Sequence, residues 1–228
     1  MIDSVLCELE GALIDCSAQQ RRALQSAFAG EGISLPDALY DEHCSGRSTE
    51  LAVEAALHAL QHSDDPVLPE LLVLGSRRHF RNEISRGVLL APGAADFLDA
   101  ARATSRLALV TCSARAEAEL LLSIAGLDST FECTICADDV RESAASGALY
   151  DGAIARLGRR RTVDRRRVVA LVSGSEGARN ARAAGVHCVI VGSLPRDEQI
   201  GVTAVASLAE ITPALLESLT DPAREYAA

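Results

Sequence analysis

Short apolar runs alternate with segments of helical pattern along this chain, and that alternation restricts the folds open to it. The apolar runs lie at residues 5–9, 106–111, 131–137, 168–173 and 188–191, and a shorter candidate strand lies at 204–205. Strands that are separated by helices in this way form parallel sheets. The sequence therefore predicts an α/β fold built on a doubly wound, Rossmann-like parallel sheet.

A long helical stretch separates the first apolar run from the others. Residues from about 17 to 86 have a helical pattern, with breaks near 30–36, 44–48 and 63–69. We expect this stretch to form a separate helical cap of residues 17–86, inserted into an α/β core of residues 1–16 and 87–228. A chain of 228 residues with 48% apolar residues can bury a core of that size.

The charge of the chain excludes some partners and one catalytic group. The net charge of -10 argues against nucleic acid as a general partner. All 22 basic residues are arginine, so a catalytic lysine is excluded.

Because no apolar run is as long as a membrane span and no signal peptide is evident, we expect a cytoplasmic protein without membrane insertion. Seven cysteines, an odd number, are typical of reduced thiols in a cytosol.

The octapeptide at the end of the first apolar run carries the most specific signal. Residues 8–15 read E-L-E-G-A-L-I-D. This stretch resembles the D-x-D-G-T-L-x-D signature of the haloacid dehalogenase (HAD) superfamily of phosphoryl-transfer enzymes. Later segments follow in matching order and spacing, and the resemblance is to the branch that holds phosphoglycolate phosphatases and β-phosphoglucomutases. It implies a HAD core with a helical cap after the first motif.

The resemblance places the nucleophile of the family on Glu8 and its general acid/base on Glu10. Ala12 replaces a threonine of the signature. Each glutamate carries one methylene more than aspartate, which moves the carboxylate by about 1 Å, and a misplacement of that order can cost about a hundredfold in rate. Glutamate can still be a nucleophile in principle. The alternative interpretation is two surface carboxylates at a strand end.

The strand predicted at residues 106–111 ends in Thr111, which Ser113 follows after one residue. The resemblance implies that Thr111, with help from Ser113, binds a phosphoryl oxygen. A threonine at a strand end is also common without any ligand, so both interpretations stay open.

Two further positions of the family pattern have lost their charged groups. The lysine that would neutralise the phosphate falls on Ala144, and Arg141 is the nearest cation. The metal-binding aspartate falls on Ser173 and its acidic neighbour on Val172. Magnesium favours carboxylate oxygens in near-octahedral geometry. We therefore expect no metal at the degenerate positions Glu8 and Ser173 and no cofactor, with Mg²⁺ only if the protein is active.

Two arginine features could bind anions. Arg47 falls in a loop that contributes substrate contacts in the resembled family, although a helix start capped by Ser48 or Thr49 explains the same residues. Seven arginines lie between residues 156 and 167. They indicate either a docking patch for an acidic partner or a solvated turn before the next strand.

These losses predict a HAD phosphatase-like protein without Mg²⁺-dependent phosphoryl transfer. Such a pseudoenzyme would act by binding, assembly or regulation, with a protein partner or a small anionic metabolite. The alternative is an active HAD-type hydrolase, a phosphomonoesterase or phosphomutase, that uses Glu8 and Glu10 on a small phosphorylated metabolite.

Overall fold

The computed structural model describes residues 2–45, 47–62, 65–141, 147–192 and 203–220. The chain divides into two compact units, which we call the core unit and the helical unit. The core unit consists of Met1–Asp15 and Leu89–Ala228, and the helical unit consists of Cys16–Val88.

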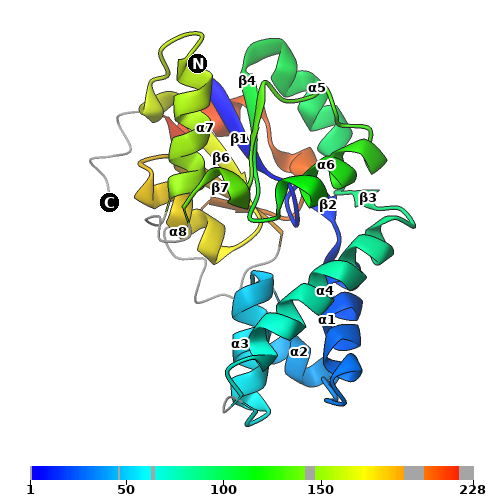
Figure 1. Cartoon of the computed structure of the whole chain (residues 1–228). Coiled ribbons are helices and arrows are strands. Elements are labelled where there is room, and N and C mark those ends of the chain that lie inside the picture. The colour runs from blue at the N-terminus through cyan, green and yellow to red at the C-terminus, as the bar shows by residue number, and fades with distance from the viewer. Residues whose placement is uncertain (1, 46, 63–64, 142–146, 193–202, 221–228) are drawn as a thin grey trace. The chain divides into compact units, whose positions relative to one another are not determined.

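A six-stranded parallel sheet forms the centre of the core unit (Figure 1). The strand order is β5-β4-β1-β6-β7-β8, with β1 in the middle of the sheet. This order confirms the predicted doubly wound α/β fold. The strands are β1 (Ser4–Glu8), β4 (Arg106–Val110), β5 (Cys133–Ile135), β6 (Val168–Val172), β7 (His187–Val191) and β8 (Thr203–Val205). A separate antiparallel pair joins β2 (Ile14–Asp15) to β3 (Leu89–Leu90).

The strand β5 is shorter than the apolar run at residues 131–137 predicts. It ends at Ile135, and the 3-10 turn η1 (Ala137–Asp139) follows. The carboxylate of Asp139 accepts a hydrogen bond of 2.8 Å from the backbone N–H of Cys136. The side chain of Asp139 therefore satisfies a backbone donor locally, in the way that an Asx turn competes with a strand ladder.

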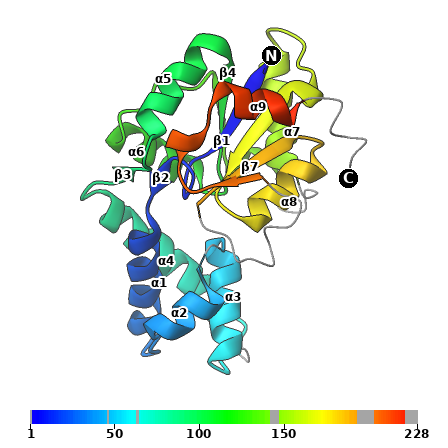
Figure 2. The same ribbon diagram turned by 180° about the vertical axis from the view of Figure 1, so that it is seen from behind.

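Helices cover both faces of the sheet, which explains why its central strands are apolar throughout. The front face in Figure 1 carries α7 (Ala148–Gly158) and α8 (Ser175–Ala183). Tyr150, Ile154 and Ala181 of these helices pack on Leu6, Val110 and Val172 of the strands. Figure 2 shows the other face, with α5 (Ala94–Thr104) and α9 (Pro213–Leu219). The other core elements are α6 (Arg115–Ile124), η2 (Arg165–Arg167) and η4 (Leu208–Glu210).

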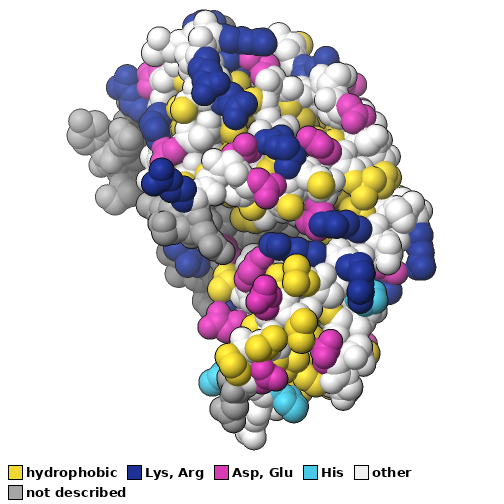
Figure 3. All heavy atoms as spheres, in the orientation of Figure 1, with side chains coloured by type: hydrophobic (Ala, Val, Ile, Leu, Met, Phe, Trp, Pro, Cys, Tyr) yellow, Lys and Arg dark blue, Asp and Glu magenta, His cyan; other side chains and the backbone are white. Residues whose placement is uncertain are grey.

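The helical unit contains α1 (Ser17–Gly30), α2 (Asp37–His43), α3 (Thr49–Ala59) and α4 (Leu68–Ile84). Its own core includes the buried side chains of Phe28, Leu57 and Leu72. Figure 3 shows hydrophobic side chains on its surface, and the exposed large ones are Leu51, Val67, Leu71 and Leu74. Within the described residues, no helix has the length and hydropathy that a bilayer span requires.

Candidate functional site at the carboxyl ends of β4, β1 and β6

Three neighbouring strands of the core unit end side by side, and each places a polar residue at its end. Glu8 is the last residue of β1, Thr111 follows β4, and Ser173 follows β6. Glu8 is paired in register with Val110, the last residue of β4. Ligands of doubly wound sheets bind at this edge, where the strand order reverses. The positions predicted from the sequence therefore meet at the expected edge of the sheet.

Both oxygens of the Glu8 carboxylate accept hydrogen bonds. Its Oε1 accepts a bond of 2.7 Å from the hydroxyl of Tyr150. Its Oε2 accepts one of 2.7 Å from the backbone N–H of Ser173 and one of 3.0 Å from the Ser173 hydroxyl. Burial raises the pKa of the Glu8 carboxyl, and these three hydrogen bonds act in the opposite direction.

Close approach of the backbone around Glu8 depends on two glycines. A Cβ added at Gly177, in the first turns of α8, would overlap the Glu8 carboxylate. Gly11 has a φ of 82° in the turn after β1, and a Cβ there would lie 2.5 Å from the Cβ of Ser173. Gly177 lets α8 approach the end of β1, and Gly11 lets the turn after β1 approach the end of β6, more closely than a side chain would allow.

Tyr150 is a site residue that the sequence does not identify. It lies in the first turn of α7 and is buried. Burial, and then the nearby Glu8, raise the pKa of the Tyr150 hydroxyl, so that it remains a proton donor at neutral pH. The two residues are 142 positions apart in the chain, so no local motif signals their contact.

The carboxylate of Glu10 binds the two hydroxyls that the resemblance assigns to phosphate. Thr111 Oγ1 donates a hydrogen bond of 2.7 Å to Glu10 Oε2, and Ser113 Oγ donates one of 2.5 Å to Glu10 Oε1. The backbone N–H of Ser113 in turn donates to Thr111 Oγ1 at 3.0 Å. In this arrangement Thr111 and Ser113 serve a carboxylate, whose charge is of the same sign as that of a phosphate.

The donor set at this edge does not fit a magnesium ion. Val172, at the position of an acidic family residue, is buried in the core, and the hydroxyl of Ser173 donates to Glu8. No group of three or more His, Cys, Asp or Glu side chains that could hold a metal ion occurs among the residues that the structure describes. A hard divalent cation favours several carboxylate ligands, and positions 172 and 173 supply none.

Acidic side chains near the site pair with an arginine that the sequence reasoning overlooked. The guanidinium of Arg115, at the start of α6, bonds to Asp139 at 2.5 Å, and its backbone N–H bonds to Asp138 at 2.5 Å. Asp138 and Asp139 therefore tie η1 to the start of α6. Neither Glu8 nor Glu10 takes part in an ion pair with a described residue.

The other predicted positions are not joined to this network. Ala144 lies outside the described residues. Arg141 is exposed, and Arg47 is an exposed residue of the helical unit that precedes α3. The helix α3 begins with Ser48 as its N-cap, whose hydroxyl accepts a hydrogen bond from the backbone N–H of Leu51. The capping interpretation of this segment is thus realised in the structure.

Comparisons with known proteins agree with the α/β fold of the chain. No family model matches the chain. Protein CbbY of Cereibacter sphaeroides is 28% identical over 200 residues, which cover 83% of this chain and 84% of that protein. A crystal structure of CbbY from Rhodobacter sphaeroides in complex with phosphate has a TM-score of 0.79 at 26% identity and covers 95% of this chain and 100% of that chain. A β-phosphoglucomutase from Clostridium difficile has a TM-score of 0.80 at 14% identity, with 100% and 99% covered.

The chain is similar in sequence to CbbY and in fold to proteins of the haloacid dehalogenase (HAD) superfamily. This similarity confirms the resemblance drawn from residues 8–15 to phosphatase- and phosphomutase-like proteins. A variant of the Rhodobacter sphaeroides CbbY was crystallised with xylulose-1,5-bisphosphate, at a TM-score of 0.76 and 26% identity, over 92% of this chain and 96% of that chain. HAD relatives of this chain therefore bind phosphorylated small metabolites.

Proposed function

We propose that this HAD-superfamily protein does not carry out magnesium-dependent phosphoryl transfer and acts by binding, as a regulatory or assembly pseudoenzyme. The observation that carries the proposal is the pair of hydrogen bonds from Ser173 to Glu8 Oε2, at 2.7 and 3.0 Å. Ser173 stands at the family position of a metal-binding aspartate. A hydroxyl and an N–H there bind the carboxylate of Glu8 directly, where a metal would otherwise connect two carboxylates.

The hydrogen bonds and the raised pKa of Glu8 support the proposal further. Both carboxylate oxygens of Glu8 accept hydrogen bonds, which withdraw electron density and lower the nucleophilicity of the carboxylate. Burial raises the pKa of Glu8, so ionisation of this carboxyl is less favourable than in water. A nucleophile that is held by donors and costly to ionise is poorly prepared for attack.

The charge balance around a phosphate gives a third argument. Glu8 and Glu10 lie close enough for the charge of Glu10 to raise the pKa of Glu8. A phosphate dianion at this edge would meet both carboxylates, and the described residues offer no ion pair to either of them. Phosphoryl transfer depends on neutralising such charge, so binding without turnover is the favoured outcome.

One observation favours the alternative, an active hydrolase on a small phosphorylated metabolite. Both carboxylates of the first motif remain at the carboxyl end of β1. Glu10 contacts Thr111, which follows β4, and Glu8 contacts Ser173, which follows β6. The similarity to CbbY, crystallised with phosphate and with a ketose bisphosphate, points to a phosphorylated sugar as the substrate in that case.

The two proposals are separated by turnover assays on the purified protein. A panel of phosphorylated sugars, including xylulose-1,5-bisphosphate, is incubated with Mg²⁺ or Mn²⁺ and the released phosphate is measured. The matched control is Glu8→Gln, which keeps the side-chain length and removes the nucleophilic charge. We expect the same background release from both proteins. Release by the wild-type protein that Glu8→Gln abolishes would contradict the pseudoenzyme proposal and establish the hydrolase.

A further inference from the structure

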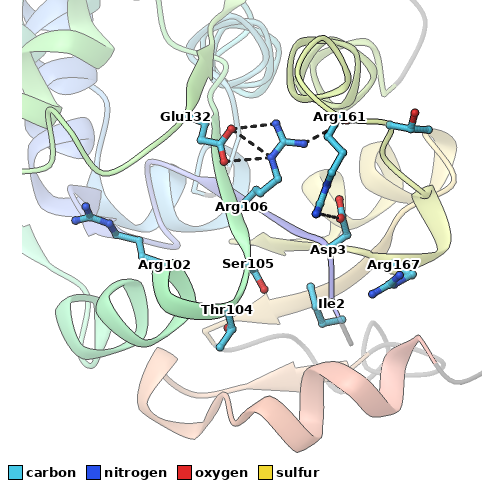
Figure 4. Close-up of a pocket in the computed structure, with 10 residues that line it drawn as sticks. Ile2, Asp3, Arg102, Thr104, Ser105, Arg106, Glu132, Arg161 and Arg167 are labelled. Carbon is cyan, nitrogen blue, oxygen red and sulfur yellow. Dashed lines mark hydrogen bonds and ion pairs between the residues drawn. The ribbon is translucent and has the colours of Figure 1, made fainter.

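A second polar pocket lies at the opposite edge of the sheet from Glu8 and Glu10. It has a volume of about 580 Å³. Its lining comes from the amino ends of β1, β4, β5 and β6, from the last turn of α5 and from the residues that follow α7 (Figure 4). These segments are at the amino ends of the strands, whereas the candidate site is at the carboxyl ends. The pocket is therefore separate from the site described above.

Arginines outnumber acids in this pocket. Arg102, Arg106, Arg161 and Arg167 line it, together with two carboxylates, Asp3 and Glu132. The pocket therefore carries a positive charge within a chain whose net charge is -10. Figure 3 shows arginine side chains on the part of the core unit where β1 begins. Local positive charge of this kind concentrates small anions.

One wall of the pocket is held in a fixed geometry. Arg106 binds Glu132 with two parallel hydrogen bonds, from Nε to Oε1 at 3.1 Å and from Nη2 to Oε2 at 2.9 Å, and Nη2 also donates to the carbonyl of Leu157 at 2.8 Å. Only 13% of the Arg106 side chain is exposed. The hydrogen bonds from Arg106 lower the pKa of Glu132, which stays ionised. This pair orders the wall and is itself neutral, so it does not reduce the charge of the other arginines in the pocket.

Residues next to this pair present further donors, and Arg106 Nη1 itself donates to the carbonyl of Arg161 at 3.4 Å. Arg161 bonds to Asp3 at 2.5 Å, and Figure 4 shows Arg167 extending toward Ile2 on the same side. Hydroxyls of Thr104, Ser105 and Thr162 also line the pocket. Guanidinium groups bind phosphate in a bidentate manner, and hydroxyls complete the set of donors around its oxygens.

The run of seven arginines at residues 156–167 is not one continuous docking patch. Arg165 bonds to Asp151 and to the carbonyl of Ala184, and Arg166 pairs with Asp164. Only Arg161 and Arg167 of the run line the pocket. The other two arginines of the pocket, Arg102 and Arg106, come from a different part of the chain. Positively charged groups from separate segments therefore line one concave site.

We propose that this pocket binds the phosphate group of a small metabolite, as a second anion site remote from the HAD site. The volume lies within the range of about 300–1,000 Å³ that is usual for small-molecule sites. The concave lining, with charged groups from several segments, suits a compact anion better than an extended acidic peptide. The site is independent of the proposed loss of phosphoryl transfer, since none of its residues belongs to the network of Glu8.

Inorganic phosphate is the probe for the test. Titration into the isotope-labelled wild-type protein is followed by calorimetry and by amide NMR shifts. We expect saturable binding, with shifts at Ser105, Glu132 and Thr162. Arg167→Glu should weaken binding by about tenfold to a hundredfold, because it replaces a charge-assisted donor by a like charge. The matched control Arg159→Glu makes the same charge change in the same run outside the pocket, and should weaken binding much less.

Three results would overturn the proposal. The first is no saturable binding of phosphate, and the second is NMR shifts confined to Thr111, Ser113 and Ser173. The third is a glutamate-rich peptide that binds more tightly than phosphate and displaces it, which would indicate a docking face for an acidic partner. The NMR map uses the wild-type protein, so it decides the matter even if Arg167→Glu does not fold. Ser113→Ala, a change in the HAD site, should leave phosphate binding at the pocket unaltered.

Discussion

Tyr150 donates a hydrogen bond of 2.7 Å to Oε1 of Glu8, which joins the first turn of α7 to the last residue of β1. The bond holds a buried phenol against a carboxyl group whose pKa is raised by burial. Together with Ser173 it turns the expected nucleophile into the centre of a hydrogen-bond network.

Tyr150→Phe removes one donor and leaves the Glu8 carboxylate with an unsatisfied oxygen. We expect the free energy of unfolding to fall by about 1–3 kcal/mol, because the lost partner served a buried group. For a chain of this size the melting temperature should fall by about 2–4 °C for each kcal/mol. Thermal and urea unfolding measure the change. Tyr40→Phe makes the same substitution in the helical unit and should change stability little; equal losses in both variants would argue against the role of the Glu8 bond.

The pH dependence of stability should report the raised pKa of Glu8. An unfolded glutamate titrates near about pH 4.3. Because the folded pKa is higher, the folded state binds more protons between the two values, and the free energy of unfolding declines as pH rises through the folded pKa. Glu8→Gln cannot ionise. Its stability relative to the wild-type protein should therefore increase from pH 5 upward and then level off.

Urea unfolding at several pH values between about 5 and 8 measures this difference. Glu31→Gln, a change of an exposed carboxylate just after α1, controls for the loss of one negative charge. A stability difference between Glu8→Gln and the wild-type protein that stays constant over this range would show that Glu8 titrates normally.

Gly177→Ala tests the close contact between α8 and Glu8. A helix interior normally gains about 1 kcal/mol when alanine replaces glycine. Here the new methyl group would overlap the Glu8 carboxylate, so we expect a loss of about 1–3 kcal/mol in the free energy of unfolding. Gly174→Ala is the matched control, since nothing lies within 4 Å of its added Cβ and its φ of -173° is open to any residue. A stabilising Gly177→Ala would mean that Glu8 is not packed there.

Restoring the family's carboxylates should restore a metal site. The variant with Glu8→Asp, Glu10→Asp and Ser173→Asp would replace the Ser173 hydroxyl, which donates to Glu8, by an acidic ligand. Magnesium at ten times its dissociation constant should stabilise this variant by about 1.4 kcal/mol. Thermal unfolding with MgCl₂, compared with NaCl at equal ionic strength, detects the effect. Equal stabilisation of the wild-type protein by Mg²⁺ would contradict the interpretation of the donor set.

Much of the sheet follows from local sequence patterns. The apolar runs at 5–9, 106–111, 168–173 and 188–191 all contain strands, because buried parallel strands are uniformly apolar. The rule that ligand groups gather at the carboxyl edge also predicted that Glu8, Thr111 and Ser173 would lie together. The apolar run at 131–137 predicts a longer strand than β5, which ends at Ile135. The strand stops there because the Asp139 side chain accepts a hydrogen bond from the N–H of Cys136.

Contacts between distant segments could not be predicted in the same way. Tyr150 reaches Glu8 only because α7 packs on the sheet, close to the carboxyl end of β1. The resemblance to the HAD family implied that the hydroxyls of Thr111 and Ser113 bind phosphate. The sequence does not show that the longer side chain of Glu10 can accept hydrogen bonds from both. Similarly, the pocket at the amino edge combines Arg106 with Arg161, which the sequence separates.

Single-turnover measurement with the protein in excess over a phosphorylated sugar tests the central claim most directly. Xylulose-1,5-bisphosphate is mixed with a large excess of wild-type protein or of Glu8→Gln in the presence of Mg²⁺, and phosphate is followed by ³¹P NMR. Because Glu8 is held by Tyr150 and Ser173, we predict that both proteins leave the substrate intact over the same period. Complete Mg²⁺-dependent release of phosphate by the wild-type protein alone would contradict the account.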